Sequence, residues 1–134
     1  MKILGIWGSP RIGGNSEVLL DAFLEGAARG GAEVEKVALR KLKISPCLEI
    51  YHCFKHGTCP IKDDMQELYP KLLDADVVAL ASPIFFYGLS AQAKQDEIMA
   101  SKNSVGDLRE HGFFITVDPR KQRLSVFEHA QKIR

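Results

Sequence analysis

The sequence predicts an α/β domain built on a parallel β-sheet, and three observations lead to that prediction. A short apolar segment, residues 3–7, runs through a glycine-rich loop into a segment whose apolar residues have helical spacing. A second segment, residues 76–82, is almost continuously apolar, as strands covered on both faces are. Strand-like and helix-like segments alternate along the chain, which indicates parallel strands joined by right-handed crossovers.

The opening of the chain has the order strand, loop, helix, strand. Residues 3–7 form the first strand, and residues 8–16 form the loop. The helix begins at Asn15, a good N-cap residue type, and ends at Gly30-Gly31. Residues 33–39 mix acidic and apolar residues in alternation, which predicts the second strand.

The middle of the chain is an irregular excursion followed by a helix and a central strand. Residues 43–60 have no clear period and contain all three cysteines. Either Asp63 or Asp64 caps the helix, whose backbone loses one donor at Pro70. Residues 76–82 then form the central parallel strand.

The last third of the chain predicts two helices and a strand. Ser90 caps a helix that extends to about Ala100. Residues 112–117 form a fourth strand, and residues 124–133 have the apolar spacing of a last helix.

Length and composition are those of one ordinary domain. The chain has 134 residues, of which 46% are apolar and 26% charged, and we expect a single domain over residues 1–134. A net charge of +1 removes the electrostatic case for a nucleic-acid partner. No apolar run approaches the roughly 18 residues of a membrane span, and Met1-Lys2 leads into a strand rather than a signal peptide. We therefore expect a cytoplasmic protein without a membrane partner.

The loop after the first strand has the composition of a phosphate site, at the sheet edge where α/β proteins bind ligands. It supplies backbone N–H groups before a helix N-terminus, whose dipole favours anions. Its polar side chains are one cation, Arg11, and the hydroxyl or amide groups of Ser9, Asn15 and Ser16. It matches neither a P-loop nor the G-x-G-x-x-G pattern. An ordinary glycine-rich turn has the same composition.

Several motifs together carry a family resemblance. They are Gly8-Ser9-Pro10-Arg11, Gly14-Asn15-Ser16, Ser45-Pro46-Cys47, Ile61-Lys62-Asp63-Asp64-Met65, Ser82-Pro83-Ile84-Phe85-Phe86-Tyr87-Gly88 and Ser90-Ala91-Gln92-Ala93-Lys94. In this combination the chain resembles the NADPH-dependent FMN reductases and their iron-sulfur flavoprotein relatives. The resemblance implies a flavodoxin-like, doubly wound parallel sheet and FMN as cofactor, with NAD(P)H as co-substrate. It further implies that Ser9, Arg11, Asn15 and Ser16 hold the FMN phosphate.

The loop after the central strand is the second candidate ligand contact. A flat heterocycle needs apolar contact on its faces and N–H groups at its carbonyl edge. The resemblance implies that the isoalloxazine ring meets these groups at Pro83, Ile84, Phe85, Phe86, Tyr87 and Gly88. Hydrophobic cover for the next helix is the alternative for at least one of the three aromatic residues. Because the cofactor carries the hydride chemistry, we name no catalytic residue.

The three cysteines depart from the pattern of the iron-sulfur flavoproteins. Cys47, Cys53 and Cys59 are separated by five residues each, and Ile50 occupies the second position of the four-cysteine pattern. A cubane cluster normally takes four thiolates. We therefore expect three reduced thiols. A cluster completed by a histidine, a three-iron cluster and zinc are less favoured alternatives.

The resemblance weakens after Lys94. The usual fifth strand and final helix are missing, so we expect four strands in a C-terminally short chain. The fourth strand would be an exposed edge, which invites pairing with another chain, and we expect a homodimer or higher homo-oligomer. Asp118 follows the fourth strand where the family tends to have glycine, and its charge would disfavour the reduced, anionic flavin.

The leading functional hypothesis is an FMN-binding oxidoreductase. It would transfer a hydride from NAD(P)H to FMN and pass electrons on to a small-molecule acceptor. A flavin-binding electron-transfer module without reductase activity and a cofactor-free assembly partner are the alternatives. Flavin absorbance separates the first two hypotheses from the third, and bleaching by NADPH separates the first from the second.

Overall fold

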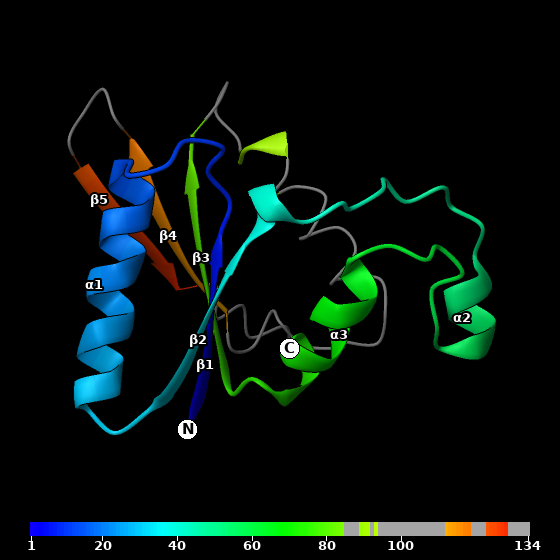
Figure 1. Cartoon of the computed structure of the whole chain (residues 1–134), viewed down its shortest axis with the longest axis horizontal. Helices are drawn as coiled ribbons and strands as arrows, with labels where there is room; N and C mark the ends of the chain where they lie inside the picture. The colour runs from blue at the N-terminus through cyan, green and yellow to red at the C-terminus, as the bar shows by residue number, and fades with distance from the viewer. Residues whose placement is uncertain (85–88, 92, 94–111, 119–122, 129–134) are drawn as a thin grey trace, which may run out of the picture.

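The computed structural model describes residues 1–84, 89–91, 93, 112–118 and 123–128. Its strands form one sheet in the order β2-β1-β3-β4-β5 (Figure 1). The strands are β1 (Lys2–Trp7), β2 (Glu33–Ala38), β3 (Val77–Pro83), β4 (Gly112–Asp118) and β5 (Arg123–Glu128). The pairs β1–β2, β1–β3 and β3–β4 are parallel, so the predicted parallel α/β sheet is confirmed.

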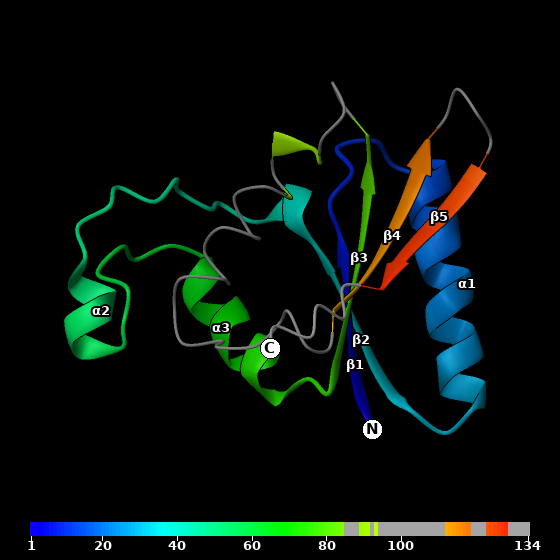
Figure 2. The same ribbon diagram turned by 180° about the vertical axis from the view of Figure 1, so that it is seen from behind.

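Two helices cover opposite faces of this sheet. Figures 1 and 2 show α1 (Asn15–Arg29) on one face and α3 (Met65–Asp74) on the other. Leu20 and Leu24 of α1 are buried, as are Met65, Leu68 and Leu72 of α3. The sheet is therefore doubly wound, as the sequence predicts.

Strand β1 contributes side chains to both hydrophobic cores, because its side chains alternate between the two faces of the sheet. Leu4 and Ile6 belong to the core on the α3 side. Ile3 and Trp7 belong to the core on the α1 side. A Cβ at Gly5 would lie 2.7 Å from a methyl carbon of the Leu24 side chain, so glycine lets α1 pack close to the sheet.

The helix starts differ in detail from the prediction. Gly14, not Asn15, is the N-cap of α1, and Asn15 is its first helical residue. The helix ends at Arg29 with Gly30 as its C-cap, as predicted. The glycine at the start leaves α1 without a side-chain cap.

The paired aspartates before α3 fasten the excursion to the helix. Asp63 accepts the N–H of Met65 at 3.0 Å and the N–H of Ser45 at 2.7 Å. Asp64 accepts the N–H of Lys43 at 2.7 Å. Asp64 is the N-cap residue of α3, but its carboxylate holds the irregular segment instead of capping the helix.

The excursion over residues 43–60 is irregular, as predicted, apart from the short helix α2 (His52–His56). The single turn η1 (Leu39–Lys41) lies between β2 and the excursion. Figures 1 and 2 both show α2 projecting away from the sheet. Tyr51 before α2 and Gly57 after it have left-handed backbone conformations, which turn the chain sharply at both ends.

The C-terminal prediction is partly wrong. Residues 124–128, predicted as the start of a helix, belong to strand β5, which pairs antiparallel with β4. The apolar residues Leu124 and Val126 alternate with Ser125, a spacing that a strand satisfies as well as a helix does. Because β5 covers β4, the fourth strand is not the exposed edge that we expected. Residues 129–134 of the predicted helix lie outside the described residues.

The fourth strand and the helix after Ser90 were also predicted. Strand β4 confirms the predicted fourth strand. Of the predicted helix from Ser90 to Ala100, the structure describes Ala91 and Ala93 as helical. Within the described ranges, no helix is long and apolar enough to cross a membrane.

Candidate functional site

The loops after β1 and β3 begin side by side at the carboxyl edge of the sheet, because these two strands are neighbours. Trp7 is paired with Ala81 in the parallel ladder, and the N–H of Gly8 donates to the carbonyl oxygen of Ala81 at 2.8 Å. The ends of the two strands that precede the predicted ligand loops are thus brought together. A third candidate contact, Asp118, ends β4 at the same edge, and residues 119–122 after it lie outside the described part of the chain.

Two buried serines tie these loops to each other. The Ser82 hydroxyl accepts the N–H of Ser90 at 3.0 Å. The Ser90 hydroxyl donates to the carbonyl oxygen of Gly8 and accepts the N–H of Ala93 at 3.2 Å, which confirms Ser90 as a helix cap. A Cβ on Gly8 would lie 2.8 Å from the Cβ of Ala93, so only glycine fits this contact without displacement. The first loop is therefore anchored at its base.

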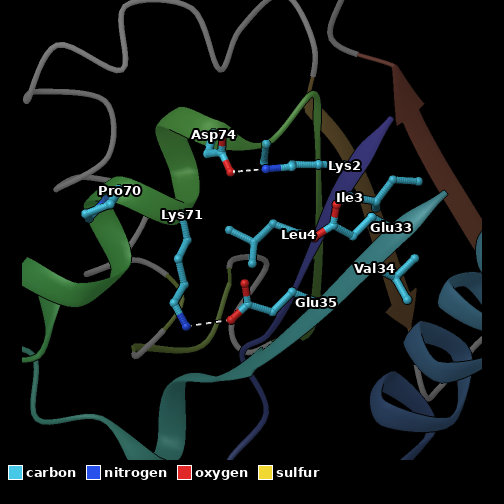
Figure 3. Close-up of a pocket in the computed structure, with 10 residues that line it drawn as sticks. Lys2, Ile3, Leu4, Glu33, Val34, Glu35, Pro70, Lys71 and Asp74 are labelled. Carbon is cyan, nitrogen blue, oxygen red and sulfur yellow. Dashed lines mark hydrogen bonds and ion pairs between the residues drawn. The ribbon is translucent and has the colours of Figure 1, made fainter.

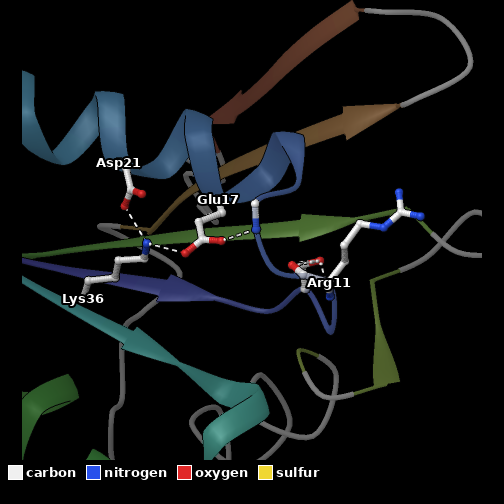
Figure 4. A network of polar contacts seen from close by, with 6 residues as sticks. Arg11, Glu17, Asp21 and Lys36 are labelled. Atoms are coloured by element: carbon white, nitrogen blue, oxygen red, sulfur yellow. Dashed lines mark hydrogen bonds and ion pairs between the residues drawn. The ribbon is translucent and has the colours of Figure 1, made fainter.

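Ser9 and Arg11 shape the outer part of the first loop. Ser9 is buried, and its hydroxyl accepts the N–H of Arg11 at 3.2 Å. Arg11 is exposed, and its guanidinium forms no ion pair with any residue that the structure describes. Its side chain extends away from α1 toward the end of β3 (Figure 4). A cation held over the loop in this way is available to an anion.

The N-terminus of α1 completes the donor set. Asn15 is exposed and Ser16 is buried, both in the first turn. Because Gly14 provides no side-chain cap, the first N–H groups of the helix lack a side-chain acceptor among the described residues. Free N–H groups at the positive end of a helix favour a bound anion. These residues therefore fit a phosphate group.

The structure describes only the first two residues, Pro83 and Ile84, of the predicted ring-binding segment 83–88. Pro83 is the last residue of β3, and Ile84 follows it; both are half-buried. The expected ring contacts of Phe85, Phe86, Tyr87 and Gly88 lie outside the described residues. Pro83 and Ile84 stand at the same edge of the sheet as Gly8 and Ser9.

One functional feature escaped the sequence prediction. Glu17 Oε2 accepts the N–H of Gly13 at 2.7 Å, and Glu17 Oε1 lies 3.1 Å from the Nζ of Lys36 (Figure 4). The Gly13 hydrogen bond lowers the pKa of Glu17, and the Lys36 contact adds to this against the opposing effect of burial. Burial lowers the pKa of Lys36, but hydrogen bonds to Asp21 and Glu17 outweigh it and raise that pKa. A glutamate at the third position of a helix is a known capping signal, and it was available in the sequence.

The cysteines do not fit an iron-sulfur cluster. Cys47 and Cys59 pack partly buried against the core on the α3 side, whereas Cys53 lies on α2. Ile50 is 57% exposed at the position where the resemblance expects a further cysteine. In the part of the chain that is described, no three His, Cys, Asp or Glu side chains are grouped to hold a metal ion. Within the described ranges, the three thiols are therefore not grouped with other ligands as a cluster requires.

A separate open pocket of about 310 Å³ lies far from these loops. It is formed at the amino ends of β1 and β2 and along α3 (Figure 3). Ion pairs Lys2–Asp74 at 2.6 Å and Lys71–Glu35 at 2.5 Å span it. Both lysines of this pocket are thus paired with carboxylates that line it, and the pocket takes no part in the candidate site.

The parallel strand order β2-β1-β3-β4, with a glycine-rich loop between β1 and α1, defines a flavodoxin-like α/β domain. The sequence model of the NADPH-dependent FMN reductases matches residues 1–95. The chain belongs to this family.

Individual relatives agree with that assignment. The chain is 42% identical over 94 residues to an iron-sulfur flavoprotein of Methanocaldococcus jannaschii, a match covering 70% of this chain and 49% of the relative. It is 43% identical over 94 residues to an iron-sulfur flavoprotein of Archaeoglobus fulgidus, covering 70% of this chain and 43% of the relative. The chain thus spans about half the length of the curated relatives that it matches.

A solved structure supports the fold. The NAD(P)H:quinone oxidoreductase from Methanothermobacter marburgensis superposes with a TM-score of 0.65. The superposition covers 77% of this chain and 54% of that chain at 20% sequence identity. At this identity the similarity concerns the fold alone.

Proposed function

We propose that this chain binds FMN and acts as an NAD(P)H-dependent oxidoreductase. The observation that carries the proposal is the loop after β1. There Arg11, which has no ion pair with any described residue, precedes a helix N-terminus that no described side chain caps. Membership of the NADPH-dependent FMN reductases supports the choice of FMN among phosphate-bearing ligands.

The phosphate of FMN would be held by Ser9, Arg11, Asn15 and Ser16. Arg11 supplies the charge, and the first turn of α1 supplies N–H groups. Asn15 and Ser16 add side-chain donors at the same turn. Ser9 holds the turn through the Arg11 backbone, because its hydroxyl accepts the Arg11 N–H at 3.2 Å and donates to the Arg11 carbonyl oxygen at 3.4 Å. A phosphate oxygen would replace the longer of these two contacts as the acceptor of the hydroxyl hydrogen.

The ring of FMN would lie against the loop that begins with Pro83 and Ile84. Because Ser82 and Ser90 fasten this loop to Gly8, the ring site and the phosphate site are held in one arrangement. We extend the ring contacts to Phe85, Phe86, Tyr87 and Gly88. Bound FMN supplies the redox chemistry, which is hydride acceptance from NAD(P)H and electron transfer onward.

The acceptor and the assembly state complete the proposal. A small molecule would receive the electrons, and the chain would function as a homodimer or higher homo-oligomer. Four large apolar side chains support assembly, because they are exposed on the projecting excursion: Leu48, Ile50, Tyr51 and Phe54. Light scattering at micromolar concentration tests this part, and a monomeric mass would contradict it.

The test of function uses the purified protein with FMN. We expect the protein to retain FMN after desalting, to show flavin absorbance and to lose that absorbance when NADPH is added without oxygen. Retained FMN that NADPH does not bleach would contradict the reductase activity. Protein that retains no FMN would contradict the whole proposal.

A further inference from the structure

The carboxylate of Glu17, on α1, accepts a hydrogen bond from the backbone of the proposed phosphate-binding loop, residues 8–16. Gly13 donates its N–H to Glu17 Oε2 at 2.7 Å. The φ of Gly13 is 65°, in the left-handed region, so the chain turns sharply at this residue. Glu17 is the third residue of α1 and reaches back one residue beyond the N-cap Gly14. The contact therefore closes the loop against the first turn of the helix.

The sheet in turn holds this carboxylate. Lys36 lies on β2, opposite Gly5 of β1. Its Nζ is 3.1 Å from Glu17 Oε1 and 2.6 Å from Asp21 Oδ1, and it lies 5.1 Å from the centroid of the Trp7 ring. The two carboxylates bind the ammonium group from α1 (Figure 4), and the Trp7 ring adds a cation–π contact. The position of the Gly13 amide is thus linked to strand β2.

The contacts of Glu17 with Gly13 and Lys36 also keep its negative charge away from Arg11. One oxygen of Glu17 binds the Gly13 amide and the other binds Lys36, so the carboxylate is satisfied. Arg11 points away from Glu17 (Figure 4) and has no ion pair in the described part of the chain. An acid close to the loop therefore does not compete with a phosphate for the guanidinium.

We propose that Glu17 is a positioning residue for phosphate binding, which acts through the Gly13 amide and is itself held by Lys36. The inference rests on the proposed FMN site and deepens it. Glu17 does not touch the phosphate. It fixes the loop before the ligand arrives, and a loop that is already ordered loses less entropy on binding. Because riboflavin lacks the phosphate, this contribution favours FMN over riboflavin.

The test compares the two flavins in matched variants. Glu17→Ala removes the contact, Glu17→Gln keeps an oxygen that accepts the Gly13 N–H, and Glu25→Ala removes an exposed glutamate of the same helix. Dissociation constants for FMN and riboflavin are measured by quenching of flavin fluorescence. We expect Glu17→Ala to weaken FMN about tenfold, the typical effect of one lost hydrogen bond, and to leave riboflavin nearly unchanged. Glu17→Gln should restore most of the affinity, and Glu25→Ala should have no effect.

The outcomes that overturn the inference are distinct from failure of the FMN site. Equal weakening of both flavins by Glu17→Ala would show a merely structural role, and unchanged FMN affinity would show no role. Wild-type protein that binds FMN no better than riboflavin would contradict the phosphate site itself, before any variant is compared.

A second measurement covers the case in which Glu17→Ala does not fold. The Gly13 amide resonance is followed by NMR in the flavin-free wild-type protein and in Lys36→Met. We expect this resonance to move and its hydrogen to exchange faster in Lys36→Met, together with a smaller loss of FMN affinity. An unchanged Gly13 amide in Lys36→Met would contradict the link between β2 and the loop.

Discussion

The hydroxyl of Ser90 donates a hydrogen bond to the carbonyl oxygen of Gly8, although the two residues are 82 positions apart in the chain. The same hydroxyl accepts the N–H of Ala93, and Ser90 is 1% exposed. This side chain therefore joins the loop after β1 to the segment that follows β3. Its environment leads to the first prediction.

We expect Ser90→Ala to lower the free energy of unfolding by about 1–3 kcal/mol, because a buried carbonyl and a helix N–H both lose their partner. FMN affinity should fall as well, since the two loops are no longer fastened together. Denaturant unfolding and FMN titration measure both effects. Ser45→Ala is the control, because this serine is exposed and its hydrogen bond to Asp63 comes from the backbone N–H, which alanine keeps. Equal stability of the two variants would contradict the role of Ser90.

Alanine substitutions at Gly8 and Gly26 should change the stability of the protein in opposite directions. Gly8→Ala places a methyl group 2.8 Å from the Cβ of Ala93 and should destabilise the protein by about 1–3 kcal/mol. Gly26 lies within α1, where a Cβ meets no atom within 4 Å, so Gly26→Ala should stabilise by about 0.5–1 kcal/mol. Thermal unfolding of both variants separates a packing effect from a general effect of alanine. A stabilising Gly8→Ala would show that the two loops are not in close contact.

The contact between Glu17 and Gly13 predicts a pH dependence of stability. Because the hydrogen bond lowers the pKa of Glu17 in the folded protein, ionised Glu17 stabilises the fold at pH above its ordinary value of 4.5. That contribution is lost as pH falls from 4.5 through the lower pKa of the folded state. The stability difference between wild type and Glu17→Gln should thus be full at neutral pH and shrink below pH 4.5. Unfolding curves over this pH range measure it, and a constant difference would count against an ionised acceptor.

Asp118 predicts an effect on the redox potential of bound FMN. It is the last residue of β4, and its neighbour Val117 is paired with Pro83 at the carboxyl edge of the sheet. A negative charge near the flavin disfavours the reduced, anionic ring, so Asp118→Gly should raise the midpoint potential. Asp118→Asn should raise it too, because charge rather than size causes the effect. Redox titration of the FMN-bound variants checks this, and an unchanged potential would remove Asp118 from the site.

Local patterns in the sequence predicted most of the fold. The apolar runs around Ile6 and Ala79 identified two central strands, and Gly30 marked the end of α1. The start of α1 was misplaced, because Asn15 is a better cap by residue type than the glycine that the loop uses. Strand β5 was missed because a short apolar segment fits two periods, and pairing with β4 decides between them.

The candidate site was predicted by residue type but not by its connections. The sequence placed Ser9 and Arg11 in one loop, which the structure confirms as a short turn. It offered no indication that Ser90 would bond Gly8 or that Lys36 would bond Glu17, because these contacts depend on which strands and helices become neighbours. These tertiary hydrogen bonds hold the loop that contains Ser9 and Arg11 in place.

Flavin binding by Arg11→Ala is the most direct test of the proposal that the loop after β1 binds the FMN phosphate. FMN and riboflavin are titrated into the wild-type protein and into Arg11→Ala, and binding is followed by calorimetry. If Arg11 binds the phosphate, Arg11→Ala should weaken FMN by about 1.5–3 kcal/mol, the loss expected for a hydrogen bond to a charged group, and leave riboflavin unchanged. Equal losses for both flavins, or no loss for either, would contradict a phosphate site in the loop after β1.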